Sequence, residues 1–372
     1  MSKRASDIAG SILTPGGWVE GRVSVHDGAI AGVEGKPIPA GKPPGPYVLP
    51  GFIDLHVHGG GGNDWQGGEA SVRGMAEFHA RQGTVALLPT TATAQKPVIE
   101  AALQAIAAVE ADHRPGEAIV LGAHLEGPFI NPDKLGAQEP AALAGDPELA
   151  GQWASLCRIR VATVAPEIDG GLDVIRALTA AGTRVQIAHS LATAEQAAAG
   201  FDAGCTGFTH LFNAMTGVDH RSPGVAAYAL AHGTHAEMIC DLLHVHHTVV
   251  TLAARAIPKL YAISDSTMAG LPDGQHHWGG HAVIKKGLRV TLEDGKTLAG
   301  SAVTLLDCFR NLVSIGFPLD EVSAMTSTRQ ADYLGLSDLG RITPGARACL
   351  VRLDEKLHLT GVWIDGLPVE RD

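Results

Sequence analysis

The stretch Pro50-Gly51-Phe52-Ile53-Asp54-Leu55-His56-Val57-His58 determines which fold is predicted for this chain. Its apolar residues are typical of a strand that is buried on both faces, as in a parallel sheet. Side chains alternate along a strand, so His56 and His58 point to the same side. Two imidazoles on one face of a buried strand can hold one divalent metal ion. Such a pair is weak evidence by itself, because histidines of this kind are often structural.

Length and composition indicate a globular protein with one large domain and a small one. The chain has 372 residues, of which 45% are hydrophobic and 18% are charged. A single core rarely serves a chain of this length. The net charge of −11 argues against a nucleic-acid partner, because no basic stripe is available to neutralise phosphates. No signal-type apolar core follows the first residues, and no long uncharged apolar segment predicts a membrane partner.

The cysteines favour a reducing compartment. Five are scattered along the chain without a Cys-x-x-Cys pair: Cys157, Cys205, Cys240, Cys308 and Cys349. An odd, unpatterned set of this kind is typical of packing residues. We therefore predict a cytoplasmic protein.

The middle of the chain alternates short apolar runs with alanine-rich helical stretches such as 95–111 and 193–203. Eight such units predict a (β/α)₈ barrel over residues 51–335. The ends, residues 1–50 and 336–372, contain short strands and turns, and we expect them to pair into one small β-sandwich domain. The candidate barrel strands are 51–58, 83–90, 119–125, 159–165, 184–189, 205–210, 236–241 and 260–265.

Polar residues follow the ends of the predicted strands, where such barrels place their active sites. A single histidine there is usually a hydrogen-bonding core residue, Glu126 could cap a turn, and Asp265 could begin a helix. Several unpaired charges or imidazoles converging on one mouth would nevertheless be costly, and a shared metal centre would satisfy them. Besides His56 and His58, the residues are Glu126, His189, His210, His244 and Asp265.

The ligand chemistry of these residues suggests a role for each of them. Glu126, His189 and His210 form a set typical of catalytic zinc, with one position open for water. His56 and His58 could hold a second ion, with Glu126 bridging and Asp265 nearby. Asp265 is the expected general base, and later the acid that protonates a leaving nitrogen. His244 would then polarise or hydrogen-bond the substrate.

With these residues in place, the chain resembles the N-acetylglucosamine-6-phosphate deacetylases of the amidohydrolase superfamily. The metal-strand motifs identify only the superfamily. The segments around Glu126 and His210 together are more specific to the deacetylases. The matching stretches are 50–59, His124-Leu125-Glu126-Gly127-Pro128-Phe129, 188–190, Thr209-His210-Leu211-Phe212-Asn213-Ala214-Met215, 264–265, 269–274 and Leu298-Ala299-Gly300-Ser301.

The resemblance implies a fold, a reaction and a cofactor. The fold is the barrel with a small β-sandwich built from both termini. The reaction is hydrolysis of the N-acetyl amide of N-acetylglucosamine 6-phosphate to glucosamine 6-phosphate and acetate, in amino-sugar catabolism. Glu126, His189 and His210 are implied to hold the principal metal, with Asp265 as the acid/base. The cofactor is expected to be Zn²⁺, one or two per subunit, with Fe²⁺, Mn²⁺ or Co²⁺ as alternatives.

The resemblance also implies how the substrate is bound. Asn213 and Ala214 are expected to contact the sugar or phosphate, and Ala137, Gln138 and Ala299 to line the same site. Arg221 is implied to reach across the interface of a homodimer to the substrate phosphate bound in the partner subunit's site. Its planar guanidinium suits this role.

Departures from the family pattern bear on metal count and substrate. Some members lack the first-strand histidines, whereas this chain keeps His56 and His58. Leu242 replaces a glycine common before the substrate-binding histidine, and is expected to reshape the sugar pocket. Gln138 stands where the family tends to have histidine, so it cannot supply a positive charge near a phosphate.

Two other functions compete with this interpretation. Another amidohydrolase could deacetylate a different N-acylated amino sugar or an N-acyl amino acid, or hydrolyse a cyclic amide. Cyclic-amide hydrolases and N-acyl amino-acid deacylases often use a carboxylated lysine as the bridging ligand, but no lysine lies at a predicted strand end here and Glu126 occupies that position. A non-catalytic sugar-phosphate sensor should have lost metal ligands or Asp265, and all are present. The remaining histidines are not expected to act. His246 and His247 should begin a helix, and His276, His277 and His281 should lie in a glycine-rich loop.

Overall fold

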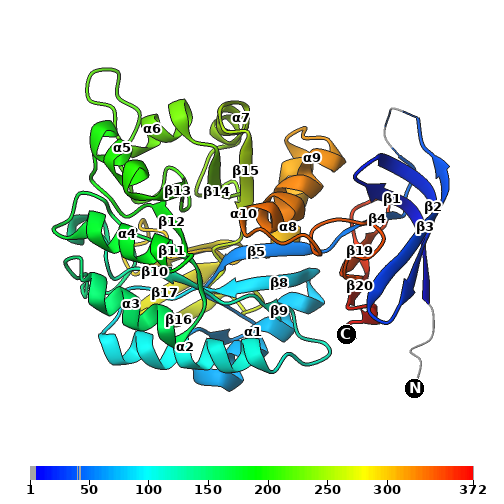
Figure 1. Ribbon diagram of the computed structural model, residues 1–372, viewed down its shortest axis with the longest axis horizontal. Helices are drawn as coiled ribbons and strands as arrows, with labels where there is room; N and C mark the ends of the chain where they lie inside the picture. The colour runs from blue at the N-terminus through cyan, green and yellow to red at the C-terminus, as the bar shows by residue number, and fades with distance from the viewer. Residues whose placement is uncertain (1–5, 40, 42, 372) are drawn as a thin grey trace.

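The computed structural model describes residues 6–39, 41 and 43–371. Within them, parallel strands occupy eight positions around a barrel, drawn in blue to yellow-green in Figure 1. The barrel closes where His58 N–H donates to Ser266 O at 2.9 Å, joining its first strand to the end of its last. The strands are β5 (Phe52–Val57), β8 (Thr84–Pro89), β9 (Ile119–Val120) with β10 (Ala123–Glu126), β11 (Ile159–Thr163), β12 (Arg184–Ile187), β13 (Cys205–Phe208), β14 (His235–Ile239) and β15 (Lys259–Ile263).

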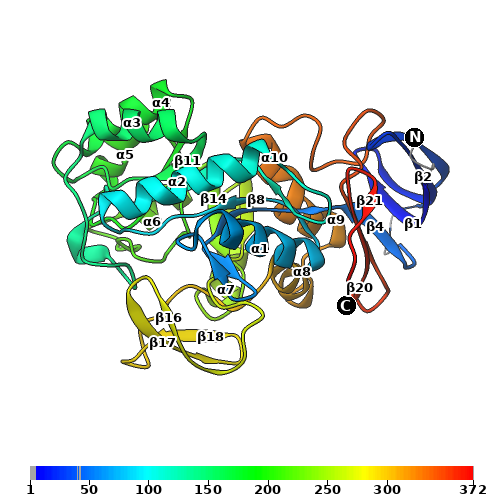
Figure 2. The same ribbon diagram turned by 90° about the horizontal axis from the view of Figure 1, so that it is seen from below.

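Helices cover the outside of the barrel (Figures 1 and 2). Several begin with side-chain caps, such as the capping box of Thr193 and Gln196 before α5. Between α9 and α10 lies a π-helical turn, η2 (Ala324–Thr328). The helices are α1 (Gly68–Arg81), α2 (Lys96–Ala111), α3 (Pro147–Leu156), α4 (Gly171–Ala180), α5 (Ala194–Ala203), α6 (Val225–His232), α7 (His247–Ala256), α8 (Leu305–Ser314), α9 (Leu319–Ser323) and α10 (Arg329–Tyr333), with the short 3₁₀ helix η1 (Pro132–Lys134).

Strands from both termini form one sheet beside the barrel, at the right of Figure 1. Leu350 pairs with Pro50, directly before the histidine strand, so the small domain anchors the start of β5. It has its own apolar core, which includes Ile8, Ile12 and Val23. The sheet order is β21 (Leu367–Pro368), β20 (Leu359–Ile364), β19 (Leu350–Leu353), β4 (Tyr47–Pro50), β1 (Ser6–Thr14), β2 (Gly17–His26) and β3 (Ala29–Pro37).

The barrel with a small β domain from both termini is therefore confirmed, while the boundary at 335/336 stays a prediction. All five cysteines are buried and unpaired among the described residues, as packing residues should be. One hydrophobic core fills the space between barrel and helices, and continues into the β domain through Tyr47 and Leu49.

One expectation is wrong. Residues 274–292 form an antiparallel sheet instead of a glycine-rich loop, with strands β16 (Gly274–Trp278), β17 (His281–Lys286) and β18 (Arg289–Leu292). Gly279 and Gly280 both have positive φ and form the two-residue turn between β16 and β17, a conformation that glycine favours. The glycines therefore mark a hairpin. Figure 2 shows this sheet projecting below the barrel in yellow. A separate short pair, β6 (Gly59–Gly60) with β7 (Asn63–Asp64), follows the barrel's first strand.

Candidate active site

All of the predicted strand-end residues except His56 line one cavity of about 310 Å³. Glu126 ends β10, and His189, His210 and Asp265 each follow a barrel strand by two residues. These last three have positive φ values of 47°, 33° and 50°. A non-glycine residue in that conformation costs on the order of 1–2 kcal/mol, and such strain is common where side chains must be aimed at a site.

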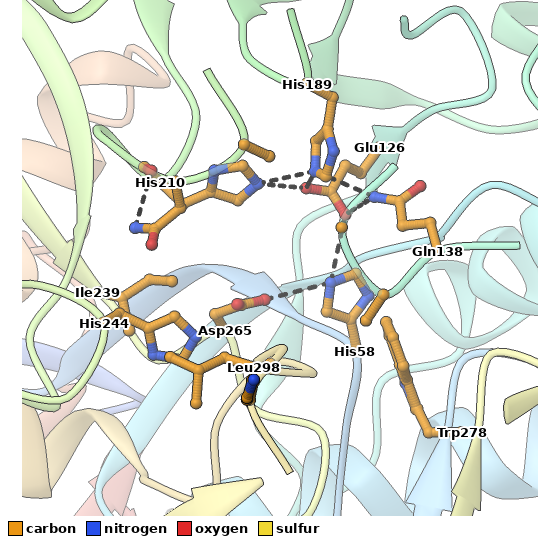
Figure 3. A pocket seen from close by; sticks show the side chains of 16 residues that line it. His58, Glu126, Gln138, His189, His210, Ile239, His244, Asp265, Trp278 and Leu298 are labelled. Carbon is orange, nitrogen blue, oxygen red and sulfur yellow. Dashed lines mark hydrogen bonds and ion pairs between the residues drawn. The ribbon is translucent and has the colours of Figure 1, made fainter. Parts of the chain in front are cut away.

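Glu126, His189 and His210 form the first group of candidate ligands. Glu126 Oε1 lies 2.8 Å from His210 Nε2 and 3.2 Å from His189 Nε2, and the two nitrogens are 3.0 Å apart. All three residues are buried. Figure 3 shows their side chains converging on one point.

A cation fits this point because His189 presents a lone pair to it. His189 Nδ1 lies 2.7 Å from Lys134 O, an atom that can only accept a hydrogen bond. Nδ1 therefore carries the hydrogen, and in the neutral ring Nε2 keeps its lone pair. That lone pair faces the oxygens of Glu126, an arrangement that a shared positive ion makes favourable. Fixing a ring by its other nitrogen is typical of metal-ligating histidines.

His56, His58 and Asp265 form a second buried group. The Nε2 atoms of His56 and His58 are 3.2 Å apart, and each lies 3.3 Å from Asp265 Oδ1. His58 Nδ1 faces Thr90 O at 3.0 Å, so Nδ1 carries a hydrogen and Nε2 is the nitrogen that turns to Asp265 and Glu126. Glu126 lies between the groups, with Oε2 3.4 Å from His58 Nε2. This geometry suits a carboxylate that bridges two ions.

The electrostatics of the site favour positive charge. Burial lowers the pKa of His58, but its hydrogen bonds to Asp265 and Glu126 outweigh burial and raise the pKa to about 10. Burial would raise the pKa of Glu126, yet the surrounding histidines, His56 foremost, hold it well below its usual range. Glu126 is therefore ionised, and its charge attracts a cation.

Comparisons with known proteins agree with this geometry. Residues 47–369 match the model of the amidohydrolase family. The chain belongs to the amidohydrolase family. This amidohydrolase is 37% identical to the N-acetylgalactosamine-6-phosphate deacetylase of Escherichia coli O157:H7 over 366 residues, which are 95% of this chain and 96% of the relative. It is 35% identical to the N-acetylglucosamine-6-phosphate deacetylase of Bacillus subtilis over 356 residues, 89% of this chain and 88% of that one.

Solved structures agree as well. A mutant N-acetylglucosamine-6-phosphate deacetylase of Mycobacterium smegmatis, in complex with N-acetylglucosamine 6-phosphate, aligns with a TM-score of 0.89 at 29% identity. The alignment covers 98% of this chain and 99% of that one. The Thermotoga maritima enzyme of the same name also gives 0.89, at 30% identity, covering 99% and 100%. The resemblance to these deacetylases is confirmed. None of the described helices has the length and apolarity to cross a membrane.

Gln138 holds the carboxylate of Glu126, one of the candidate metal ligands, in this amidohydrolase. Its Oε1 accepts Thr93 N–H at 2.8 Å, which fixes the amide so that Nε2 donates to Glu126 Oε2, also at 2.8 Å. The residue is buried and lines the cavity. Gln138 thus orients Glu126, a role that the sequence did not indicate.

His244 is held in place by Asp241. Asp241 Oδ2 lies 2.7 Å from His244 Nδ1, and Asp241 Oδ1 accepts the backbone N–H of His244. Nε2 is left for the cavity, which His244 lines (Figure 3). Leu242 has φ of 62°, so it follows the path a glycine would take; it is not among the cavity-lining residues. Its expected effect on the pocket therefore finds no support in the geometry.

The other predicted substrate residues divide into two groups. Ala137, Asn213 and Ala214 line the cavity. Ala299 does not: it is fully buried, and its carbonyl accepts the Thr267 hydroxyl. Arg221 is exposed in the 216–224 loop and is also absent from the lining residues of its own chain.

Trp278 and Glu237 are among the residues at the site that were not predicted from the sequence. Trp278 packs edge-on against His58, with ring centroids 5.2 Å apart, and its Nε1 has no partner among the described residues. Glu237, in the middle of β14, is fully buried with Oε2 3.0 Å from His56 Nδ1. A charged residue inside an otherwise apolar strand was the available signal. His124, in contrast, has both nitrogens hydrogen-bonded, to Leu55 O and the Thr163 hydroxyl, and is structural.

Glu237→Ala is expected to weaken metal binding at the His56–His58 pair by about 10- to 100-fold, because Glu237 fixes the ring orientation of His56. The metal content per chain, measured after dialysis against a graded metal buffer, checks this. Tyr261→Phe removes the hydrogen bond that the Tyr261 hydroxyl donates to Glu237 at 3.3 Å, while the contact of Glu237 with His56 stays, and should have little effect. Unchanged metal content in a folded Glu237→Ala protein would contradict the prediction.

Proposed function

We propose that this amidohydrolase hydrolyses the N-acetyl amide of N-acetyl-D-glucosamine 6-phosphate to D-glucosamine 6-phosphate and acetate, in amino-sugar catabolism. The observation that carries the proposal is the meeting, at one cavity, of a carboxylate–imidazole ligand set with Asp265 and His244. A cavity of about 310 Å³ falls within the range of small-molecule sites. The names of the relatives agree with this substrate class.

The proposed cofactor is a divalent metal held by Glu126, His189 and His210. Zn²⁺ suits one carboxylate and two imidazoles, and Fe²⁺, Mn²⁺ and Co²⁺ accept the same donors. His56 and His58 would hold a second ion. A metal bound at the principal site supplies Lewis-acid polarisation of the acetyl carbonyl.

The chain's own residues would then carry the proton. Asp265 Oδ1 accepts a proton from water as the water oxygen forms its bond to the acetyl carbon. When the carbon–nitrogen bond breaks, Asp265 returns that proton to the leaving amine. His244, fixed by Asp241, donates from or accepts at Nε2 and so positions the sugar. Gln138 keeps Glu126 in place throughout.

The cellular setting is also part of the proposal. We place the enzyme in the cytoplasm as a homodimer in which Arg221 reaches the partner subunit's site. Unpaired, buried cysteines support a reducing compartment. The exposure of Arg221 supports its availability to a partner.

A second substrate is favoured by one specific observation. The 37% identical relative from Escherichia coli O157:H7 is an N-acetylgalactosamine-6-phosphate deacetylase. N-acetylgalactosamine 6-phosphate differs from N-acetylglucosamine 6-phosphate only in the configuration at C4, away from the amide. The same metal and Asp265 chemistry would serve both.

Acetate release from the two N-acetylhexosamine 6-phosphates and from unphosphorylated N-acetylglucosamine tests the substrate. We expect kcat/KM to be at least about tenfold higher for a phosphorylated sugar, the effect of one charged hydrogen bond. The ratio between the epimers then decides which is preferred. Equal rates with and without the phosphate would contradict the proposed substrate class while keeping the deacetylase chemistry.

A further inference from the structure

Trp278 lines the cavity on the side away from the residue proposed to position the sugar. In Figure 3, His244 and Leu298 lie on one side of Asp265. Trp278 lies on the opposite side, beside His58. The rings of Trp278 and His58 pack edge-on, with centroids 5.2 Å apart. An indole therefore closes the end of the cavity next to the second group of candidate ligands.

The hairpin of β16 and β17 holds Trp278 in this position. Among the five residues of β16, all of which the structure describes, Trp278 is the only buried one, with 5% of its surface exposed. The hairpin turn lies close to the loop that supplies Gln138 to the cavity. A Cβ added to Gly280 would come within 2.8 Å of Glu139 Oε1. The turn is therefore seated firmly, and the indole has little freedom to move aside.

The indole nitrogen indicates that packing alone does not explain a tryptophan here. Nε1 of Trp278 is buried and has no partner among the described residues. A buried donor without an acceptor is unfavourable, and phenylalanine would supply an aromatic surface without this cost. The property that tryptophan adds is its size. Size matters where a side chain limits the space that is open to a ligand.

The shape of an amide assigns the two ends of the cavity. An amide is planar and normally trans, so its acyl group and its nitrogen substituent point in opposite directions. With the sugar on the side of His244, the acyl group extends toward Trp278. Gln138 lies on this side as well, but its amide is already engaged by Thr93 N–H and Glu126 Oε2. The indole is thus the apolar surface that an acyl chain meets.

We propose that Trp278 closes the acyl end of the cavity and restricts the substrate to short acyl groups, acetyl before longer ones. This inference rests on the proposed function and adds to it a specificity-determining residue for the acyl chain. One methylene more than an apolar pocket accommodates changes kcat/KM by about 10- to 200-fold. The cause is that closely packed walls yield only with strain.

The test measures kcat/KM of the metal-loaded protein for the N-acetyl, N-propionyl and N-butanoyl forms of glucosamine 6-phosphate, with release of the carboxylic acid as the readout. The wild type should lose about tenfold or more for each added methylene. Trp278→Ala is expected to raise the ratio of N-butanoyl to N-acetyl turnover about tenfold or more, because it opens the wall. Trp278→Phe should give an intermediate ratio.

Two control variants separate the acyl wall from general effects on the cavity. Leu298→Ala enlarges the cavity on the sugar side, so it should change KM for all three forms by the same factor and leave their ratios unchanged. His277→Ala alters the exposed neighbour of Trp278, which does not line the cavity, and should match the wild type. A folded Trp278→Ala protein with the wild-type ratio would overturn the inference. So would a wild type that hydrolyses the N-butanoyl form as fast as the N-acetyl form.

A binding measurement makes the test independent of turnover. Asp265→Asn is expected to bind the three forms without hydrolysing them, so calorimetry gives a Kd for each. Adding Trp278→Ala to this variant should lower the Kd ratio of N-butanoyl to N-acetyl about tenfold or more.

The two measurements distinguish failure of this inference from failure of the proposed function. If the wild type releases no acid from any form, the proposed function fails, and the Kd ratio still decides the role of Trp278. Acid release with ratios that do not depend on residue 278 would leave the function standing and overturn the inference. Absence of binding of all three forms to Asp265→Asn would overturn the inference as well.

Discussion

Replacing Asp265 by asparagine is expected to reduce kcat for acetate release by about 10²- to 10⁴-fold, the usual range for removing a positioned general acid–base. The amide of asparagine is nearly the same size as the carboxylate but cannot accept the proton of water. Asp265 lines the cavity, and its Oδ1 lies 3.3 Å from the Nε2 atoms of both His56 and His58, beside the candidate metal ligands. Steady-state kinetics with N-acetylglucosamine 6-phosphate measure the loss.

The asparagine variant should still bind metal and substrate. Asp273→Asn is the matched control, because Asp273 lies in the same segment, is exposed and does not line the cavity. It should have near wild-type kcat. Substantial turnover by a folded Asp265→Asn protein would remove Asp265 from the acid–base role.

Glu126→Gln is expected to abolish activity by a different route, because the protein should lose its principal metal. Glu126 contacts His189, His210 and His58, so one carboxylate serves both groups of candidate ligands. The variant keeps the shape but removes the charge that attracts the ion. We expect metal affinity to fall by more than the about 10- to 100-fold typical of losing a supporting contact.

Metal content and acetate release should fall together in Glu126→Gln and recover partly at high metal concentration. Glu139→Gln provides the control, since Glu139 lies beside Gln138 but belongs to no candidate ligand group. A Glu126→Gln protein with full metal content and wild-type kcat would show that Glu126 is not a ligand.

The barrel could be predicted because each of its strands is a short apolar run between helical stretches. The expected strand 184–189 corresponds to β12 (Arg184–Ile187), and the expected helix 193–203 to α5 (Ala194–Ala203). Since parallel strands end at the same mouth, the residues after each strand had to converge. The proximity of Glu126, His189, His210 and Asp265 could therefore be predicted from the sequence, although the distances between them could not.

Contacts between residues distant in sequence could not be predicted in this way. Glu237 pairs with His56 across 181 positions, and no local pattern links them. Gln138 could be seen as a hydrogen-bonding residue, but its orientation depends on Thr93 N–H from another loop.

Whether a residue inferred from a family motif lines the cavity depends on details of the backbone. Ala299 is turned away from the cavity, while Lys296, three residues earlier, lines it. The backbone there depends on the turn that Asp294 fixes. The glycine pair after Trp278 is typical of a loop in the sequence, and its role as a hairpin turn becomes evident only when the flanking residues pair.

The most direct test of metal-dependent deacetylation is acetate release from N-acetylglucosamine 6-phosphate by protein whose metal content has been counted. The measurement is made before chelation, after chelation, and after one and two equivalents of Zn²⁺ are returned. We expect activity to disappear with the metal and to return with the first or second equivalent. Undiminished acetate release from metal-free protein, or none from the metal-loaded protein, would contradict the proposed function.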